Sequence, residues 1–136
     1  MTFVIDNSIV MAWCFEDETS AYSDSILDRL QEGDARVPAI WPLEVANALL
    51  VAERRHRLTE ARTAHFAELL LSLPIVVEEG AVNRTLGPVL LVGRAHRLSA
   101  YDAAYLELAS REGIPLATQD ARLRTAAESA GVALVR

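Results

Sequence analysis

The chain has 136 residues, of which 51% are apolar and 24% are charged, a composition typical of one soluble globular domain. It contains one cysteine and no lysine, which excludes an internal disulfide, a thiolate zinc site, a P-loop and Schiff-base chemistry. The net charge of −6 argues against nucleic-acid binding driven by overall charge, but not against a local arginine-lined groove. The N-terminus does not resemble a signal peptide, and no apolar run is long enough to cross a membrane. We therefore expect a cytoplasmic protein.

The first half of the chain alternates short apolar runs with helical patterns. We expect strands at 3–5 and 36–39 and helices at 9–15, 21–31, 41–52 and 59–73. Pro42 suits the first turn of its helix, whereas Pro38 makes the extent of the second strand less certain. Four aromatic residues are expected in the core: Trp13, Phe15, Trp41 and Tyr101.

The second half continues the alternation. We expect strands at 74–77, 114–118 and 132–135 and helices at 81–97, 100–112 and 121–130. Gly87-Pro88 should break or kink the first of these helices, and Ser99 should cap the second. This order predicts an α/β fold: a three-layer α/β/α sandwich around a mainly parallel sheet of about five strands, in one domain spanning 1–136.

Four carboxylates occupy comparable places in these elements. Asp6 ends the first strand, Glu44 and Asp102 lie in the first turns of helices, and Asp120 follows the fourth strand. Ligands of parallel sheets bind at the carboxyl ends of the strands, so we expect these acids to gather there. Each acid alone is also explained as a helix cap or as a partner of the helix dipole.

The setting of the acids favours a metal site over isolated caps. Asp6, Glu44 and Asp102 lie in apolar segments, where an unpaired charge is costly, and no lysine is available to neutralise them. Carboxylates without a cysteine or histidine pair suit Mg²⁺ or Mn²⁺ and indicate phosphodiester chemistry. In that chemistry a metal-bound water attacks phosphorus.

The segments that carry the acids resemble the four motifs of PIN-domain ribonucleases, in particular the VapC-like toxins of bacterial toxin–antitoxin pairs. The resemblance covers almost the whole chain and rests on 4–13, 42–49, 99–106 and 116–123. It implies that the four acids form the metal site and the catalytic centre. It also implies that Ser8, Asn47 and Thr118 support them by hydrogen bonding.

The resemblance implies a Mg²⁺- or Mn²⁺-dependent endoribonuclease that acts on RNA, pairs with a cognate antitoxin protein and forms a homodimer. Four arginines near the acids are candidates for holding substrate phosphates, with a solvated helix face as the alternative for each: Arg94, Arg97, Arg122 and Arg124.

Two other functions remain open. One is a non-catalytic RNA- or protein-binding module on the same fold. The other is a phosphatase with Asp6 as the nucleophile, which is disfavoured because Ser8 stands where such enzymes carry a second aspartate and because no lysine is present.

Overall fold

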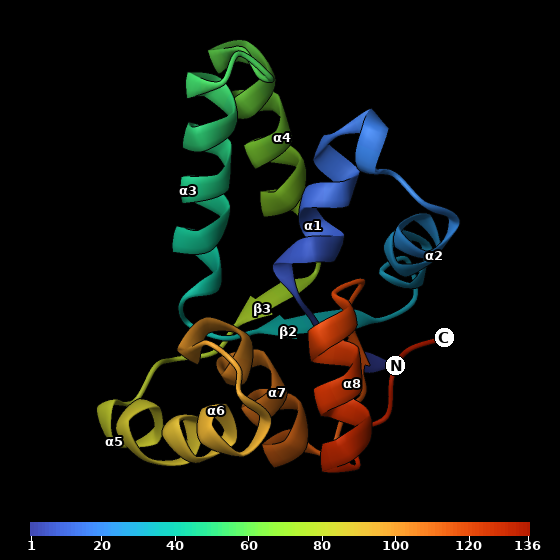
Figure 1. Ribbon diagram of the computed structural model, residues 1–136. Coiled ribbons are helices and arrows are strands. Elements are labelled where there is room, and N and C mark those ends of the chain that lie inside the picture. Colours follow the sequence, from blue (N-terminus) through green and yellow to red (C-terminus); the bar gives the residue numbers. More distant parts are fainter.

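Four parallel strands form the sheet at the centre of the computed structural model, which describes residues 1–136 (Figure 1). Their order is β3-β2-β1-β4, and Val4 of β1 pairs with Arg36 on one side and Leu116 on the other. The strands are β1 (Thr2–Ile5), β2 (Asp34–Val37), β3 (Ile75–Val77) and β4 (Leu116–Ala117). The predicted parallel sheet is confirmed, and β1 is an interior strand with a neighbour on each edge.

Helices cover both sides of this sheet, as predicted. They are α1 (Asn7–Cys14), α2 (Ala21–Arg29), α3 (Trp41–Arg54), α4 (Glu60–Ser72), α5 (Val82–Arg84), α6 (Leu90–His96), α7 (Ala100–Glu112) and α8 (Ala121–Ala130), with a 3-10 turn η1 (Glu16–Glu18) and a π-helical turn η2 (Thr85–Val89). Figure 1 shows α3 and α4 as a hairpin that extends away from the sheet, while α5, α6 and α7 lie together on the opposite side. None of the helices is both long and apolar enough to span a membrane.

The core is built around β1 and α7. Phe3, Val4 and Ile5 are fully buried, as a strand with neighbours on both edges and helices on both faces requires. Leu106 and Leu108 of α7 pack into the same contiguous cluster. Asp6, which follows β1 directly, is therefore held at the end of a strand whose last three residues are fully buried.

Two predictions about the core are wrong. The segment 132–135 forms only a single parallel bridge, between Leu134 and Leu116, so the sheet has four strands rather than five. Val132 and Val135 are buried, so this apolar run packs against the core without forming a full ladder. Tyr101 is 58% exposed, because it lies in the first turn of α7 outside the buried face that runs through Ala103.

The interruption expected at Gly87-Pro88 is confirmed. Both residues lie in η2, between the short helix α5 and helix α6. Proline has no backbone N–H to donate and its ring crowds the preceding turn, so a regular helix cannot run through it. The chain widens into a π-helical turn there instead.

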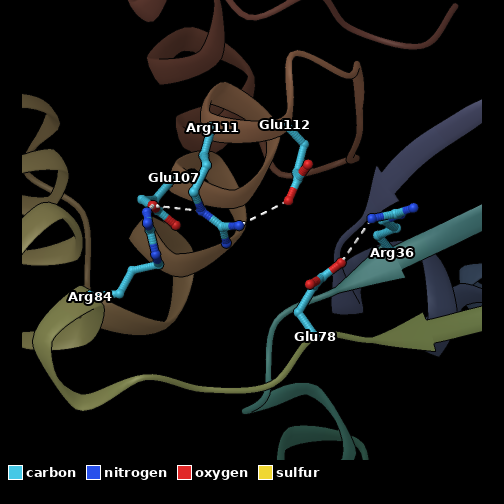
Figure 2. Close-up of polar contacts among 6 residues, drawn as sticks. All are labelled: Arg36, Glu78, Arg84, Glu107, Arg111 and Glu112. Atoms are coloured by element: carbon cyan, nitrogen blue, oxygen red, sulfur yellow. Dashed lines mark hydrogen bonds and ion pairs between the residues drawn. The ribbon is translucent and has the colours of Figure 1, made fainter.

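Helix α7 is fastened to its neighbours by a buried carboxylate. Figure 2 shows Glu107, which is 7% exposed, accepting hydrogen bonds from Arg84 (2.6 Å) and Arg111 (3.1 Å). Arg111 also pairs with Glu112, at 2.9 Å. A buried carboxylate needs such partners, and these tie α7 to the α5 segment. Close by, Arg36 of β2 pairs with Glu78 beyond β3.

Candidate active site

Asp6 is the most buried of the four predicted acids and the most fully hydrogen-bonded. Its Oδ1 accepts hydrogen bonds from the Ser8 hydroxyl (2.6 Å), the Ser8 N–H (3.1 Å) and the Ile9 N–H (3.4 Å). Its Oδ2 accepts one from the Thr118 hydroxyl, at 2.6 Å. The side chain is only 4% exposed and caps α1. Its position is therefore fixed from two sides.

Thr118 and Ser8 join the ends of β1 and β4. Besides donating to Asp6, the Thr118 hydroxyl accepts the Asp120 N–H at 3.0 Å. The Ser8 hydroxyl likewise accepts the Gln119 N–H, at 3.1 Å. Asp120 is exposed and caps α8 by accepting the Leu123 N–H at 2.9 Å. The Thr118 hydroxyl thus couples Asp6 to Asp120, and the Ser8 hydroxyl couples Asp6 to Gln119.

Tyr105 holds Glu44 against α7, the helix that also carries Asp102. Its hydroxyl donates to Glu44 Oε1 at 2.7 Å, which brings the first turn of α3 against α7. Tyr105 follows Asp102 by three residues, so both side chains belong to one face of α7. The expected cap is confirmed, since the Ser99 hydroxyl accepts the Asp102 N–H at 3.2 Å. Sequence reasoning missed Tyr105, although its spacing from Asp102 was a usable signal.

The four carboxylates share one electrostatic environment. Burial raises the pKa of Asp6 to about 6, and the charge of Asp102 adds to this effect. Desolvation also raises the pKa of Glu44 and the pKa of Asp102, which are both half-buried. The charge of Asp102 acts on Glu44, and that of Asp120 acts on Asp102. None of the four forms an ion pair, although the charge of Arg122 partly offsets the rise in the pKa of Asp102.

The residues present fit a hydrated hard cation rather than a closed metal cage. No three acidic, histidine or cysteine side chains converge closely enough to form a ready-made ligand set. Mg²⁺, however, keeps several waters and is usually held by one or two carboxylates. The donor set is made of oxygens, and Asn7 adds a buried Oδ1 that has no hydrogen-bond partner. Asn7 and Glu44 line the same open hollow of about 560 Å³.

The remaining predicted site residues differ in their surroundings. Asn47 is exposed one turn after Glu44 and lines this hollow, but it makes no hydrogen bond to any of the acids. Arg94, Arg97 and Arg122 are exposed. Arg124 instead donates to the Thr118 carbonyl at 2.8 Å, and its guanidinium carbon lies 5.5 Å from the centre of the Tyr22 ring. Arg124 is therefore engaged within the fold.

Similarity to known proteins agrees with this geometry. The sequence matches the family described as "PIN domain" over residues 3–129. Ribonuclease VapC3 of Pyrobaculum aerophilum is 28% identical over 123 residues, which cover 90% of this chain and 92% of that protein. The crystal structure of PAE2754 from the same organism superposes with a TM-score of 0.68 at 26% identity, over 93% of this chain and 87% of that one.

More distant structures share the fold. VapBC2 from Rickettsia felis, solved bound to a DNA fragment from its promoter, gives a TM-score of 0.71 at 12% identity, over 99% of this chain and 98% of that one. FitAcB from Neisseria gonorrhoeae gives 0.66 at 17% identity, over 100% and 97%. The family match spans nearly the whole chain and includes all four acids, and we conclude that the chain belongs to the PIN-domain family.

Proposed function

We propose that this protein is a Mg²⁺- or Mn²⁺-dependent endoribonuclease and the toxin of a toxin–antitoxin pair. One observation carries the proposal: four carboxylates without ion-pair partners lie within electrostatic reach of one another around Asp102, and burial raises the pKa of three of them. Such a charge cluster is stable only when a cation or a proton neutralises it. Similarity to a protein named as a ribonuclease supports RNA as the substrate.

Each of the acids has a distinct role in this proposal. Asp6 and Asp102 hold the ion directly, while Glu44 and Asp120 act through water or on a second ion. When bound, the divalent ion supplies a Lewis acid and an acidified water. Ser8 and Thr118 fix the rotamer of Asp6, since their hydroxyls donate to its two oxygens at 2.6 Å each.

Cleavage of end-labelled single-stranded RNA tests the proposal. We expect products in Mg²⁺ or Mn²⁺ and none when EDTA is added, because the acids alone cannot activate water. RNA that is bound but never cut would instead indicate a binding module. Metal-dependent hydrolysis of p-nitrophenyl phosphate without RNA cleavage would indicate a phosphatase. That outcome is disfavoured because Ser8 stands where such enzymes carry a second aspartate and because the chain has no lysine.

The partner proposals follow from the same identity. The names of two proteins with this fold, VapBC2 and FitAcB, each denote a pair of components, which supports a cognate antitoxin partner. We place this pair in the cytoplasm, where RNA is available. We also propose a homodimer. The chain mass is 14.9 kDa, and size-exclusion chromatography with light scattering should report twice this value. A monomer at micromolar concentration would rule out the stable dimer.

Tyr105→Phe should lower RNA cleavage about 10- to 100-fold while the fold is retained, since the change removes only the donor that orients Glu44. The ring is almost completely buried and stays in the core. The measurement is the single-turnover rate over a Mg²⁺ titration, with Tyr22→Phe as the control because its hydroxyl donates to the Val135 carbonyl, outside the acid cluster. An unchanged Tyr105→Phe rate would remove this residue from the proposed site.

A further inference from the structure

A groove between α6 and α8 opens beside the acids. It has a volume of about 570 Å³, and the residues that line it come from the end of α6 and from one face of α8. They are Ala95, His96, Arg97, Ala121, Arg122, Thr125, Ala126 and Ser129. The α8 residues recur at helical spacing, so they present a continuous strip along that helix. No acidic residue lines the groove.

The two arginines at this groove are not neutralised by any carboxylate. Arg36, Arg57, Arg84 and Arg111 are each paired with a carboxylate. Arg97 and Arg122 form no ion pair and donate no side-chain hydrogen bond, although the chain carries a net charge of −6 and acids are plentiful. Arg94, which is also unpaired, lies one turn earlier on α6. The groove therefore concentrates positive charge that the fold does not use.

Arg97 also has an unfavourable backbone conformation. It ends α6 in the left-handed region, with φ 54° and ψ 45°, a place that glycine usually fills. An L-residue with a side chain is strained there, and such strain persists where another interaction compensates for it. One other non-glycine residue, His56, has a positive φ (59°), and it lies at the far end of α3. The chain keeps an unpaired cation where a glycine would be better tolerated.

The groove adjoins the acids at the start of α8. Asp120 is the N-cap of that helix, and Arg122 lies in its first turn. A polyanion seated in the groove would thus extend directly toward the carboxylates.

We propose that the groove between α6 and α8 binds backbone phosphates of the RNA next to the one that is cleaved, with Arg97 and Arg122 as the phosphate ligands. The hydroxyls of Thr125 and Ser129 line the same groove and can donate to phosphate oxygens. Phosphate contacts of this kind position a nucleic acid without reading its sequence. The proposal rests on the proposed ribonuclease function and adds to it the path of the substrate.

The Arg97→Gly variant separates binding from stability. Glycine relieves the left-handed strain, so the Tm should equal or exceed that of the parent protein, while RNA affinity falls. Fluorescence anisotropy with a labelled single-stranded RNA, in Mg²⁺ and an Asp6→Asn background that prevents cleavage, measures the affinity between about 50 and 200 mM salt. The slope of log K against log salt should become shallower by about 0.7, the value for one lost phosphate contact on a single strand.

His56→Gly is the matched control, because it relieves the same kind of strain at an exposed residue far from the groove. Its RNA affinity and salt slope should equal those of the parent. A second groove variant, Arg122→Gln, should reproduce the loss seen with Arg97→Gly. The proposal is overturned if Arg97→Gly and His56→Gly bind RNA equally well. It is also overturned if Arg122→Gln binds RNA with the affinity and salt slope of the parent.

The two proposals fail in distinguishable ways. Parallel cleavage assays on the protein with Asp6 intact show whether RNA is a substrate at all. If the parent cleaves RNA and Arg97→Gly cleaves it at the same rate at sub-saturating protein, the groove proposal fails and the nuclease proposal stands. If RNA binding depends on Arg97 but no divalent metal supports cleavage, the nuclease proposal fails and RNA binding at the groove stands.

Discussion

Asp6→Asn is expected to reduce RNA cleavage to below about 1% of the wild-type rate, a larger loss than the 10- to 100-fold typical of residues that only orient a ligand. The substitution is almost isosteric. It keeps an oxygen that accepts from the Ser8 and Ile9 N–H groups, and the Thr118 hydroxyl can accept from the new amide. The fold should therefore survive while the buried negative charge disappears.

The control for this variant is Asp28→Asn, an exposed aspartate on α2 that makes no side-chain hydrogen bond to the rest of the chain. It should cleave at the wild-type rate. Single-turnover assays in saturating Mg²⁺ and circular dichroism spectra of both variants provide the comparison. Full activity of Asp6→Asn with an intact fold would contradict the role assigned to Asp6.

The metal-free protein should lose stability as the pH rises from about 4 to 7, with Asp6 responsible for most of the change. Its pKa is 3.8 in an unfolded chain and about 6 in the folded protein, so the folded state binds the proton more tightly. This contribution is fully present below pH 3.8 and is lost as the pH passes through 6, and the rise corresponds to about 3 kcal/mol. Glu44 and Asp102 shift in the same direction but are half-exposed and contribute less.

Urea denaturation of the wild type and Asp6→Asn in EDTA, at several pH values, measures this contribution. The variant cannot titrate at residue 6, so its free energy of unfolding relative to wild type should increase by about 2–3 kcal/mol between pH 4 and 7.5. Adding Mg²⁺ at pH 7.5 should stabilise the wild type more than the variant. A constant difference between the two proteins across the pH range would show that Asp6 has an ordinary pKa.

The sequence was informative wherever a local signal determined the outcome. Ser99 and Gly113 bound α7 as expected, because a hydroxyl cap and a left-handed glycine act within one turn. Asp6 lies at the end of β1, and Glu44 and Asp102 lie in the first turns of α3 and α7, as the apolar patterns around them predicted. The parallel sheet follows from the alternation of strands and helices.

Predictions that depended on distant packing did worse. Nothing near Tyr101 in the sequence shows that its side of α7 is exposed. Nothing near Leu134 shows that the segment 132–135 meets a strand, β4, of only two residues and so forms a single bridge. The roles of Tyr105 and Arg124 depend on Glu44 and Thr118, which belong to other elements. Such pairs become visible only when the elements are placed in space.

The bond between Thr118 and Asp6 also affects when the site can form during synthesis. The two residues are 112 positions apart, and β4 reaches β1 only after all the intervening helices have been made. Contacts of such long sequence separation form late, because a large loop must close first. A ribosome-bound chain that has emerged only as far as α7 holds Asp6, Glu44 and Asp102 but neither Thr118 nor Asp120. The proposed catalytic centre can thus be complete only after synthesis has passed residue 120.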